Sequence, residues 1–341
     1  MKVAVLTGGG DAPGLNAAIR AVARAGWGAG YEVIGVRNGW HGLVEANLLP
    51  LTPEAISGIL PRGGTILGTS RFNPFTVDGG PDRMLDTIHR HDIDAIVVIG
   101  GDDTLGVALK LSKLRVNVVG IPKTMDNDIP GTDFTIGFDT AVNVVMEACD
   151  RLHPTAEAHH RVMVVEVMGR DAGWVAAVGG LAGGADIILV PEVPFTIDEV
   201  CQRVKARHAR GRTFSILVVS EGAKVAELGT QIVQEARVDA FGHVRLGGVG
   251  SVLAREIEAR TGYECRVTVL GHLQRGGAPT VFDRVLATRY GVAAVGLITQ
   301  GQFGQMVALR GNTITAVPLQ DALEGTHAVS RELYDMANLF T

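Results

Sequence analysis

Short apolar runs rich in β-branched residues alternate along this chain with longer segments of helical periodicity. The runs carry apolar residues on both faces, which predicts buried strands, and the alternation predicts parallel sheets with helices on both sides. The fold class is therefore expected to be α/β. We expect strands at 2–7, 95–100, 116–122, 161–167, 185–191, 214–220 and 265–271, and helices at 15–25, 81–91, 104–114, 140–152, 197–209 and 250–260.

Length and composition restrict the class of protein further. A chain of 341 residues is long enough for two lobes, and its net charge of −5 argues against general nucleic-acid binding. The longest uncharged apolar run, 172–185, has 14 residues, fewer than the roughly 20 that a membrane-spanning helix needs. The three cysteines are widely spaced, which is typical of reduced thiols. We therefore expect a cytoplasmic protein that binds neither membrane nor nucleic acid.

Polar or glycine-rich clusters follow most of the expected strands. Ligands of parallel α/β sheets bind beyond the carboxyl ends of the strands, so these clusters mark the expected site. The clusters are TGGGDAPG, IGGDDT, IPKTMDND, EVMGRDAG, VSEGAK and LGHLQRGG.

Two glycine loops are suited to binding phosphate. The loop at 8–14 joins a strand to a helix, where main-chain amides and the helix N-terminus favour an anion. Its spacing matches neither GxGxxG nor the Walker GxxxxGK[ST] pattern, and a tight turn would explain it equally well. The second loop, at 63–71, ends in Arg71, which is a candidate phosphate ligand beside other phosphate loops and otherwise a solvated surface charge.

Carboxylates and a lysine follow two successive strands. Asp102 and Asp103 come after the strand at 95–100, and the segment PKTMDND at 122–128 follows the next one. Phosphoryl transfer needs a carboxylate that activates the attacking hydroxyl, a carboxylate that binds a metal and a cation on the transferred group. An Asx-rich turn is the structural alternative, but the two successive strand ends favour a catalytic site.

Taken together, these motifs resemble the phosphofructokinase family in their order and spacing. The resemblance runs from about residue 2 to residue 290. It implies two Rossmann-like three-layer α/β/α lobes with mainly parallel sheets and the active site in the cleft between them. The implied donor lobe comprises 1–138 and 251–301, and the fructose 6-phosphate lobe comprises 139–250 and 302–341. The implied reaction, in glycolysis, phosphorylates the C1 hydroxyl of fructose 6-phosphate to give fructose 1,6-bisphosphate.

The resemblance also implies roles for individual residues. Asp126 matches the general base, Thr124 and Asp128 beside it match contacts to the substrate and the metal site, and Asp102 matches the ligand of Mg²⁺. Donor contacts are implied for Gly10, Arg71, Asp103 and Thr104. The sugar-phosphate site is implied for Arg161, Met168, Gly169, Arg170, Glu221, Arg266, His272 and Arg275.

Chemistry supports several of these roles. Forked guanidinium groups suit a dianionic sugar phosphate better than lysine does. Taken alone, His272 would more often be a structural histidine and Met168 a core residue. In the family, Arg161 and Arg266 reach in from a neighbouring subunit, which implies a homo-oligomer, either a dimer or a tetramer.

The residues Asp103 and Lys123 bear on the phosphoryl donor. ATP-using members typically have glycine at the position of Asp103 and often at that of Lys123, so the pair resembles the branch that uses diphosphate. A carboxylate in the space of the ATP α-phosphate would repel it, by about 4 kcal/mol for unit charges 4 Å apart at an effective dielectric of 20. Lys123 would offset charge on the transferred phosphoryl group and on the phosphate product. Alternatively, Asp103 is a second metal ligand or a helix N-cap.

The leading hypothesis is thus a reversible phosphotransfer from diphosphate, with Mg²⁺ as cofactor and phosphate as second product. An ATP-dependent enzyme of the same fold is the nearest alternative, and a shared assay with both donors separates the two. A non-catalytic sensor of phosphorylated metabolites is disfavoured, because it would need neither the base nor the metal ligand. The missing GxGxxG motif disfavours a nicotinamide-dependent oxidoreductase.

Overall fold

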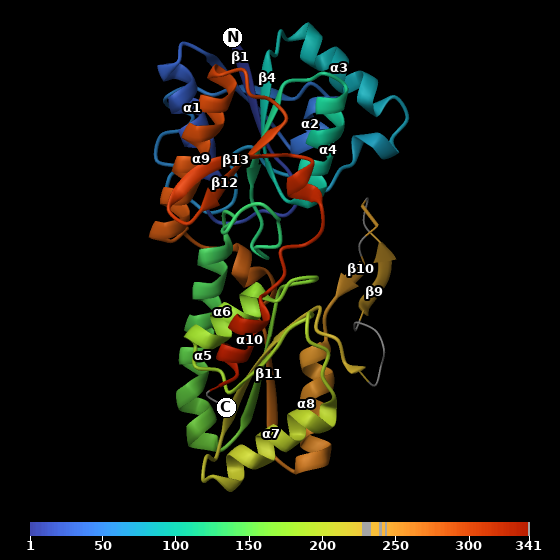
Figure 1. Cartoon of the computed structure of the whole chain (residues 1–341), viewed down its shortest axis with the longest axis vertical. Helices are drawn as coiled ribbons and strands as arrows, with labels where there is room; N and C mark the ends of the chain where they lie inside the picture. Colours follow the sequence, from blue (N-terminus) through green and yellow to red (C-terminus); the bar gives the residue numbers. More distant parts are fainter. Residues whose placement is uncertain (227–232, 239–240, 243, 340–341) are drawn as a thin grey trace.

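Two separate sheets organise the chain into two lobes, stacked along the long axis of the molecule in a computed structural model (Figure 1). The structure describes residues 1–226, 233–238, 241–242 and 244–339. Helices cover both faces of each sheet, and most strand pairs are parallel. The expected α/β class is confirmed.

The first lobe contains a sheet of seven strands with its outermost strands antiparallel to their neighbours. In hydrogen-bonded order these are β13 (Thr313–Pro318), β12 (Gln305–Arg310), β5 (Val118–Pro122), β4 (Ala95–Gly100), β1 (Lys2–Thr7), β2 (Glu32–Val36) and β3 (Leu48–Pro50). Its helices are α1 (Leu15–Gly28), α2 (Gly39–Val44), α3 (Gly80–Arg90), α4 (Asp102–Lys113) and α9 (Val281–Thr299), with a short 3₁₀ helix η1 (Pro74–Thr76).

Alternate residues of the first sheet face two different helical layers. Val3 and Val5 pack with α1 and α9 on one side, whereas Ala4 and Leu6 pack with α2, α3 and α4 on the other. This division follows from the period of two along a strand, which points successive side chains to opposite faces. The two layers explain why the strand sequences are apolar throughout.

The second lobe contains four parallel strands in the order β11 (Cys265–Val269), β6 (Val162–Val167), β8 (Ser215–Ser220) and β7 (Ile187–Leu189). One face is covered by α5 (Phe138–His159), α6 (Trp174–Ala182) and α10 (Arg331–Ala337), and the other by α7 (Ile197–Ala209) and α8 (Val249–Thr261). An antiparallel pair, β9 (Val233–Val238) and β10 (Val244–Leu246), stands beside the lobes (Figure 1). Two further 3₁₀ helices are η3 (Gly271–Arg275) and η4 (Asp321–Leu323).

All seven expected strands and all six expected helices are present, with ends that shift by a few residues. The expectations omitted several other elements. One is β2, whose fourth residue, Gly35, interrupts the apolar run; a side chain there would collide with Leu67. The others were α2, β3, α6, α9, the β9–β10 pair, β12, β13 and α10.

The implied lobe boundaries are wrong in two places. Strands β12 and β13 extend the first sheet next to β5, so 305–318 belongs to the first lobe. Helix α8 and strand β11 pack in the second lobe, because Leu253 and Cys265 are buried in its core. The chain therefore crosses between the lobes three times, as the resemblance implied, but the second and third crossings come later in the chain. It returns to the first lobe with α9 and leaves it again before α10.

A buried carboxylate joins the lobes where α9 of the first meets α5 of the second. Asp283 accepts hydrogen bonds from the backbone amides of Gly137 and Thr140, both at 2.8 Å, and from the Thr140 hydroxyl at 2.5 Å. These donors lie at the start of α5, where amides lack partners within the helix. Nearby, the Thr280 hydroxyl donates to Asp139 Oδ2 at 2.5 Å.

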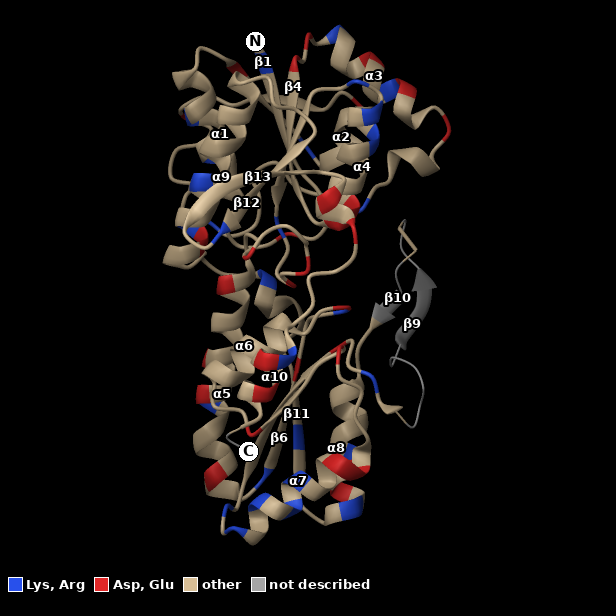
Figure 2. Cartoon of the chain, in the orientation of Figure 1, with Lys and Arg blue, Asp and Glu red and all other residues tan. Residues whose placement is uncertain are grey.

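Among the helices of the described ranges, none combines the length and the apolar character needed to cross a membrane. Acidic and basic side chains both occur on α3, α7 and α8, so these helices carry both signs of charge (Figure 2). The three cysteines are buried and unpaired.

Candidate active site

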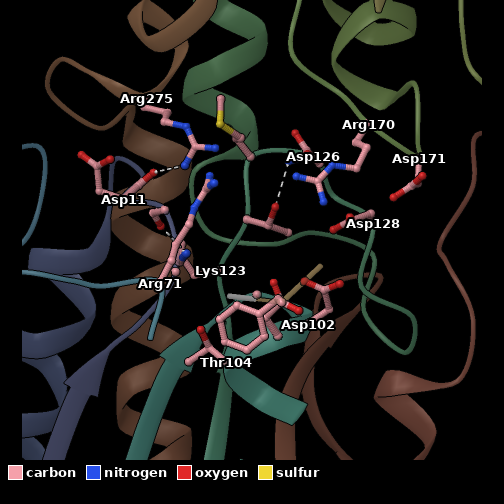
Figure 3. A pocket seen from close by; sticks show the side chains of 17 residues that line it. Asp11, Arg71, Asp102, Thr104, Lys123, Asp126, Asp128, Arg170, Asp171 and Arg275 are labelled. Carbon is pink, nitrogen blue, oxygen red and sulfur yellow. Dashed lines mark hydrogen bonds between the residues drawn. The ribbon is translucent and has the colours of Figure 1, made fainter. Parts of the chain in front are cut away.

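A polar pocket of about 110 Å³ lies where the carboxyl ends of β1, β4, β5 and β6 come together (Figure 3). It therefore occupies the place that the sequence predicted. Most of the residues expected to bind the donor or to carry the chemistry line it. The lining consists of Gly9, Gly10, Asp11, Arg71, Gly101, Asp102, Asp103, Thr104, Lys123, Thr124, Met125, Asp126, Asp128, Arg170, Asp171, Phe241 and Arg275.

The glycines of the first loop allow side chains to approach the backbone closely. A Cβ atom at Gly10 would lie 1.7 Å from a guanidinium nitrogen of Arg275, so only glycine leaves room for that arginine. Thr104 is buried against two other glycines, since a Cβ at Gly8 or Gly100 would come within 2.6 Å of its side chain. The loop thus brings α4 and Arg275 to one wall of the pocket.

Asp102 and Asp103 occupy the first turn of α4, and both line the pocket. The N-cap position belongs to Gly101, which makes no side-chain capping bond. The interpretation of Asp103 as an N-cap is therefore wrong. Both carboxylates instead lie at the positive end of the helix dipole, which stabilises their charged forms.

Lys123 is buried at the end of β5, with 3% of its surface exposed. Its Nζ donates hydrogen bonds to the main-chain oxygens of Gly8 at 3.2 Å and Gly10 at 2.5 Å. Burial, with a smaller contribution from the nearby Arg275, lowers the pKa of Lys123 to about 8. The lysine is thus a pocket cation and also a clamp on the glycine loop.

Asp126 and Asp128 follow Lys123 in the loop after β5. Burial raises the pKa of Asp126, and the guanidinium groups of Arg275 and Arg170 partly oppose this shift. Burial also raises the pKa of Asp128, to about 8, with a further contribution from the Asp126 carboxylate. A buried carboxyl with a raised pKa is typical of a group that accepts and releases a proton near neutral pH.

Two polar atoms in the pocket are buried without a hydrogen-bond partner among the described residues. They are Oδ1 of Asp126 and Nε of Arg275. Arg275 does donate from a terminal nitrogen to the main-chain oxygen of Asp11 at 3.3 Å. Because buried polar groups are normally paired, one unpaired acceptor and one unpaired donor indicate that a polar ligand completes this site.

The pocket supplies oxygen ligands of the kind that Mg²⁺ prefers. Asp102 lines it together with Asp126 and Asp128, whose pKa values respond to the charge of Asp102. In the described part of the chain, no group of three or more His, Cys, Asp or Glu side chains has the geometry of a metal site. Mg²⁺ is usually bound by one or two carboxylates plus substrate phosphates, rather than by a cage of protein ligands.

Glu221 lies just outside the pocket lining but within its electrostatic field. Burial raises the pKa of Glu221 to about 7, and the Asp126 carboxylate adds to the shift. Its backbone amide bonds the oxygen of Val167 at the end of β6 at 2.8 Å. Glu221 therefore follows β8 at the same edge of the second sheet, as predicted.

Three further residues expected at the sugar-phosphate site, Met168, Gly169 and His272, are not part of the lining. Met168 and Gly169 precede Arg170; the amide of Met168 bonds Gln274 at 3.3 Å, and the oxygen of Gly169 accepts a bond from Ser220 at 2.6 Å. His272 lies in η3, where its side chain is exposed. Of the expected arginines, Arg170 and Arg275 reach the pocket.

Arg161 and Arg266 lie at the opposite end of the second sheet. Arg161 precedes β6, and roughly 16 Å of strand separate the start of β6 from the loop with Arg170. Both arginines contact Glu264, with 2.8 Å from Arg161 Nε to Glu264 Oε2. Strand β11, which carries Arg266, is at the edge of the sheet. Neither arginine can reach the pocket of its own chain.

The sequence prediction missed four side chains in the lining. Asp11 and Asp171 stand within motifs that the prediction quoted, so their place at strand ends was a usable signal. Met125 lies between predicted site residues. Phe241 had no such signal, because it follows β9 and packs against the core of the first lobe from the second half of the chain.

Comparisons with known proteins agree with this site. The family model described as Phosphofructokinase matches residues 2–298. A pyrophosphate–fructose 6-phosphate 1-phosphotransferase of Amycolatopsis methanolica is 53% identical over all of this chain and 99% of its own. An ATP-dependent 6-phosphofructokinase of Mycobacterium tuberculosis is 51% identical with the same coverage.

A solved structure shares the architecture as well. The crystal structure of a pyrophosphate-dependent phosphofructokinase from Marinobacter aquaeolei superposes with a TM-score of 0.84 at 25% identity, covering 97% of this chain and 86% of that one. Fold, pocket position and sequence similarity over the full length lead to one conclusion. The chain belongs to the phosphofructokinase family of phosphotransferases.

Proposed function

We propose that this protein is a cytoplasmic diphosphate-dependent 6-phosphofructokinase. It transfers a phosphoryl group from diphosphate to the C1 hydroxyl of fructose 6-phosphate and releases fructose 1,6-bisphosphate and phosphate. The observation that carries the proposal is the pair Asp103 and Lys123, which line the same pocket from α4 and from the end of β5.

In this proposal Asp126 takes the proton from the attacking hydroxyl. Its Oδ1 is buried and unpaired among the described residues, so it can accept a hydrogen bond from a substrate hydroxyl. Burial raises the pKa of Asp126, which favours proton uptake, and Arg275 and Arg170 oppose that shift. The same two arginines line the pocket and suit the anionic groups of sugar phosphate and donor.

Asp102, next to the donor loop, would hold Mg²⁺. The ion would neutralise charge on the donor phosphates and orient them. Gly10, Arg71 and Thr104 line the same wall and would contact the donor phosphates, with the N-terminus of α4 adding favourable partial charge.

The choice of donor follows from the charge of Asp103. Diphosphate ends where ATP continues into an α-phosphate, and a carboxylate in that space repels a third phosphate. The relatives support diphosphate as well, since several at 47–53% identity carry the diphosphate-dependent name. ATP remains the second candidate, because relatives at 50–51% identity are named ATP-dependent.

We also propose that the enzyme works as a homo-oligomer. Arg161 and Arg266 lie too far from the pocket of their own chain, and Arg266 is exposed on the edge strand β11, where a second copy can use it. Exposed apolar side chains support such an interface: Val281, Val285 and Val292 lie on one face of α9 and are each more than half exposed. Large exposed apolar patches mark interaction sites.

One assay tests the choice of donor. Purified protein is supplied with fructose 6-phosphate and MgCl₂ plus either diphosphate or ATP, and fructose 1,6-bisphosphate is measured. We expect rapid turnover with diphosphate and little with ATP; robust turnover with ATP alone would refute the proposal.

A second experiment tests the base. Asp126→Asn should lose turnover by about 10²- to 10⁴-fold while still binding fructose 6-phosphate in calorimetry. Asp86→Asn, on the exposed surface of α3, is the matched control.

A further inference from the structure

The chain segment between η4 and α10 runs from the first lobe to the second and passes the loop that carries Asp126 (Figure 1). We name residues 324–330 the C-terminal strap. Its central residue, His327, is half-buried and contacts that loop twice. The backbone amide of His327 donates to the oxygen of Asp128 at 2.8 Å, and the ring Nδ1 lies 2.9 Å from the oxygen of Asn127.

The second contact fixes the form of the imidazole ring. A carbonyl oxygen can only accept a hydrogen bond, so Nδ1 of His327 must carry a proton and donate it. The ring therefore presents one N–H group to the residue that directly follows Asp126. This contact depends on the side chain, whereas the bond to Asp128 comes from the backbone and would survive any substitution other than proline.

The strap itself is fixed to the second lobe. Trp174 Nε1 donates to the oxygen of His327 at 2.6 Å, and the two rings lie 4.8 Å apart at an angle of 37°. Two residues further, the amide of Val329 bonds Glu192 Oε1 at 2.9 Å, and Glu192 also accepts the amide of Gly173. Trp174 begins α6, directly after the loop that carries Arg170 and Asp171.

The turn that His327 holds is one that benefits from external support. Asn127 has a φ of 53°, in the left-handed region that non-glycine residues seldom adopt. Its side chain is already used, because Oδ1 accepts from the amide of Thr135 at 2.9 Å and Nδ2 donates to the oxygen of Asp133. Burial raises the pKa of Asp128, and repulsion by the Asp126 carboxylate across this turn adds to the shift.

We propose that His327 is a positioning residue for the phosphotransfer reaction: through its Nδ1–H bond to Asn127 it holds the Asp126–Asp128 turn in register with the loop of Arg170. The inference rests on the proposed role of Asp126 as the base. A displaced carboxylate would slow proton transfer without changing how the sugar phosphate binds.

The test compares substitutions that differ in the position of one N–H group. In His327→Asn the amide nitrogen replaces Nδ1, whereas in His327→Gln it replaces Nε2, and His327→Leu has no donor. We expect kcat to fall about 10- to 100-fold in the Leu and Gln variants, with KM for fructose 6-phosphate unchanged. His327→Asn should keep most of the wild-type kcat, because it retains a donor at the position of Nδ1. His89→Leu, at an exposed site on α3, is the control.

The outcomes separate this inference from the proposed function. Wild-type kcat in the Leu variant, or equal loss in the Asn and Gln variants, would show that the Nδ1–H bond does not position the base. A parallel loss of melting temperature and of kcat in all three would show a purely structural role and equally overturn the inference. All assays use the donor that the wild-type enzyme prefers. Failure of Asp126 as the base would show instead as activity in Asp126→Asn.

Discussion

The ammonium group of Lys123 lies 2.5 Å from the main-chain oxygen of Gly10, so the cation that we propose acts on the donor also holds the glycine loop of the pocket. A second bond, to the oxygen of Gly8, makes the clamp bidentate. These two bonds hold the ammonium group inside the protein, and its burial is the main cause of the low pKa of Lys123.

The stability of the protein should therefore depend on pH through Lys123. Its pKa falls from 10.5 to about 8 in the folded chain, so between these values the unfolded chain binds more protons and stability rises with pH. This contribution to the free energy of unfolding is fully present above pH 10.5 and is lost as pH falls through 8. It amounts to at most about 3 kcal/mol. Urea unfolding at pH 8 and 10 should show this gain in the wild type.

The variant Lys123→Met supplies the comparison for that prediction. It keeps an unbranched side chain but has no titrating group, so its stability should change less between pH 8 and 10. Equal slopes in both proteins would mean that the lysine is not the source. The same variant should lose turnover with diphosphate.

Removal of the Asp103 charge should widen the choice of donor. Asp103→Gly and Asp103→Asn should both raise kcat/KM for ATP, by about 10- to 1,000-fold, because each removes a repulsion of up to about 4 kcal/mol. The Asn variant keeps the size of the side chain, so it separates charge from space. If ATP use stays unchanged in both variants, charge repulsion does not set donor choice.

Much of this site was predictable because parallel sheets bring strand ends together. Thr124, Asp126 and Asp102 follow neighbouring strands, so local sequence was sufficient to group them. His327 and Phe241 were not predictable, since each reaches the site from a distant segment with no motif of its own. The lobe boundaries failed for a similar reason. Strand β12 joins the first sheet by pairing Gln305 and Met306 with β5, a contact that strand periodicity cannot reveal.

The buried carboxylate of Asp283 should give a second pH-dependent contribution to stability, with the opposite slope. Burial raises its pKa from 3.8 to about 6, although the donors at Gly137 and Thr140 oppose the shift. Between these two pH values the folded chain binds more protons than the unfolded chain, so stability falls as pH rises. The stabilisation by Asp283 is therefore fully present below pH 3.8 and is lost as pH rises through 6. Asp283→Asn should flatten the unfolding free energy between pH 4 and 6. Asp86→Asn, at an exposed ion pair, should leave it unchanged.

A more severe change at the same position tests the link between the lobes. Asp283→Ala leaves two buried backbone amides without partners, which should cost about 2–4 kcal/mol of unfolding free energy. Because those amides begin α5, directly after the loop of Asp126, turnover should fall as well. Unchanged stability in the Ala variant would show that α5 does not need this carboxylate.

Mixed oligomers test whether Arg266 acts in the site of a neighbouring subunit. Arg266→Ala and Asp126→Asn should each be nearly inactive at low fructose 6-phosphate, the first through weak substrate binding and the second through loss of the base. In a dimer that holds one copy of each, one site has both defects and the other has an intact Asp126 and an intact Arg266. Coexpression with two affinity tags and random pairing should then restore about a quarter of wild-type activity. Within a single chain, Arg266 lies at the far end of the sheet from the pocket and pairs with Glu264. Activity in the mixture is therefore expected only if each subunit supplies its Arg266 to the site of its neighbour. A mixture no more active than its parents would show that the arginine serves only its own chain.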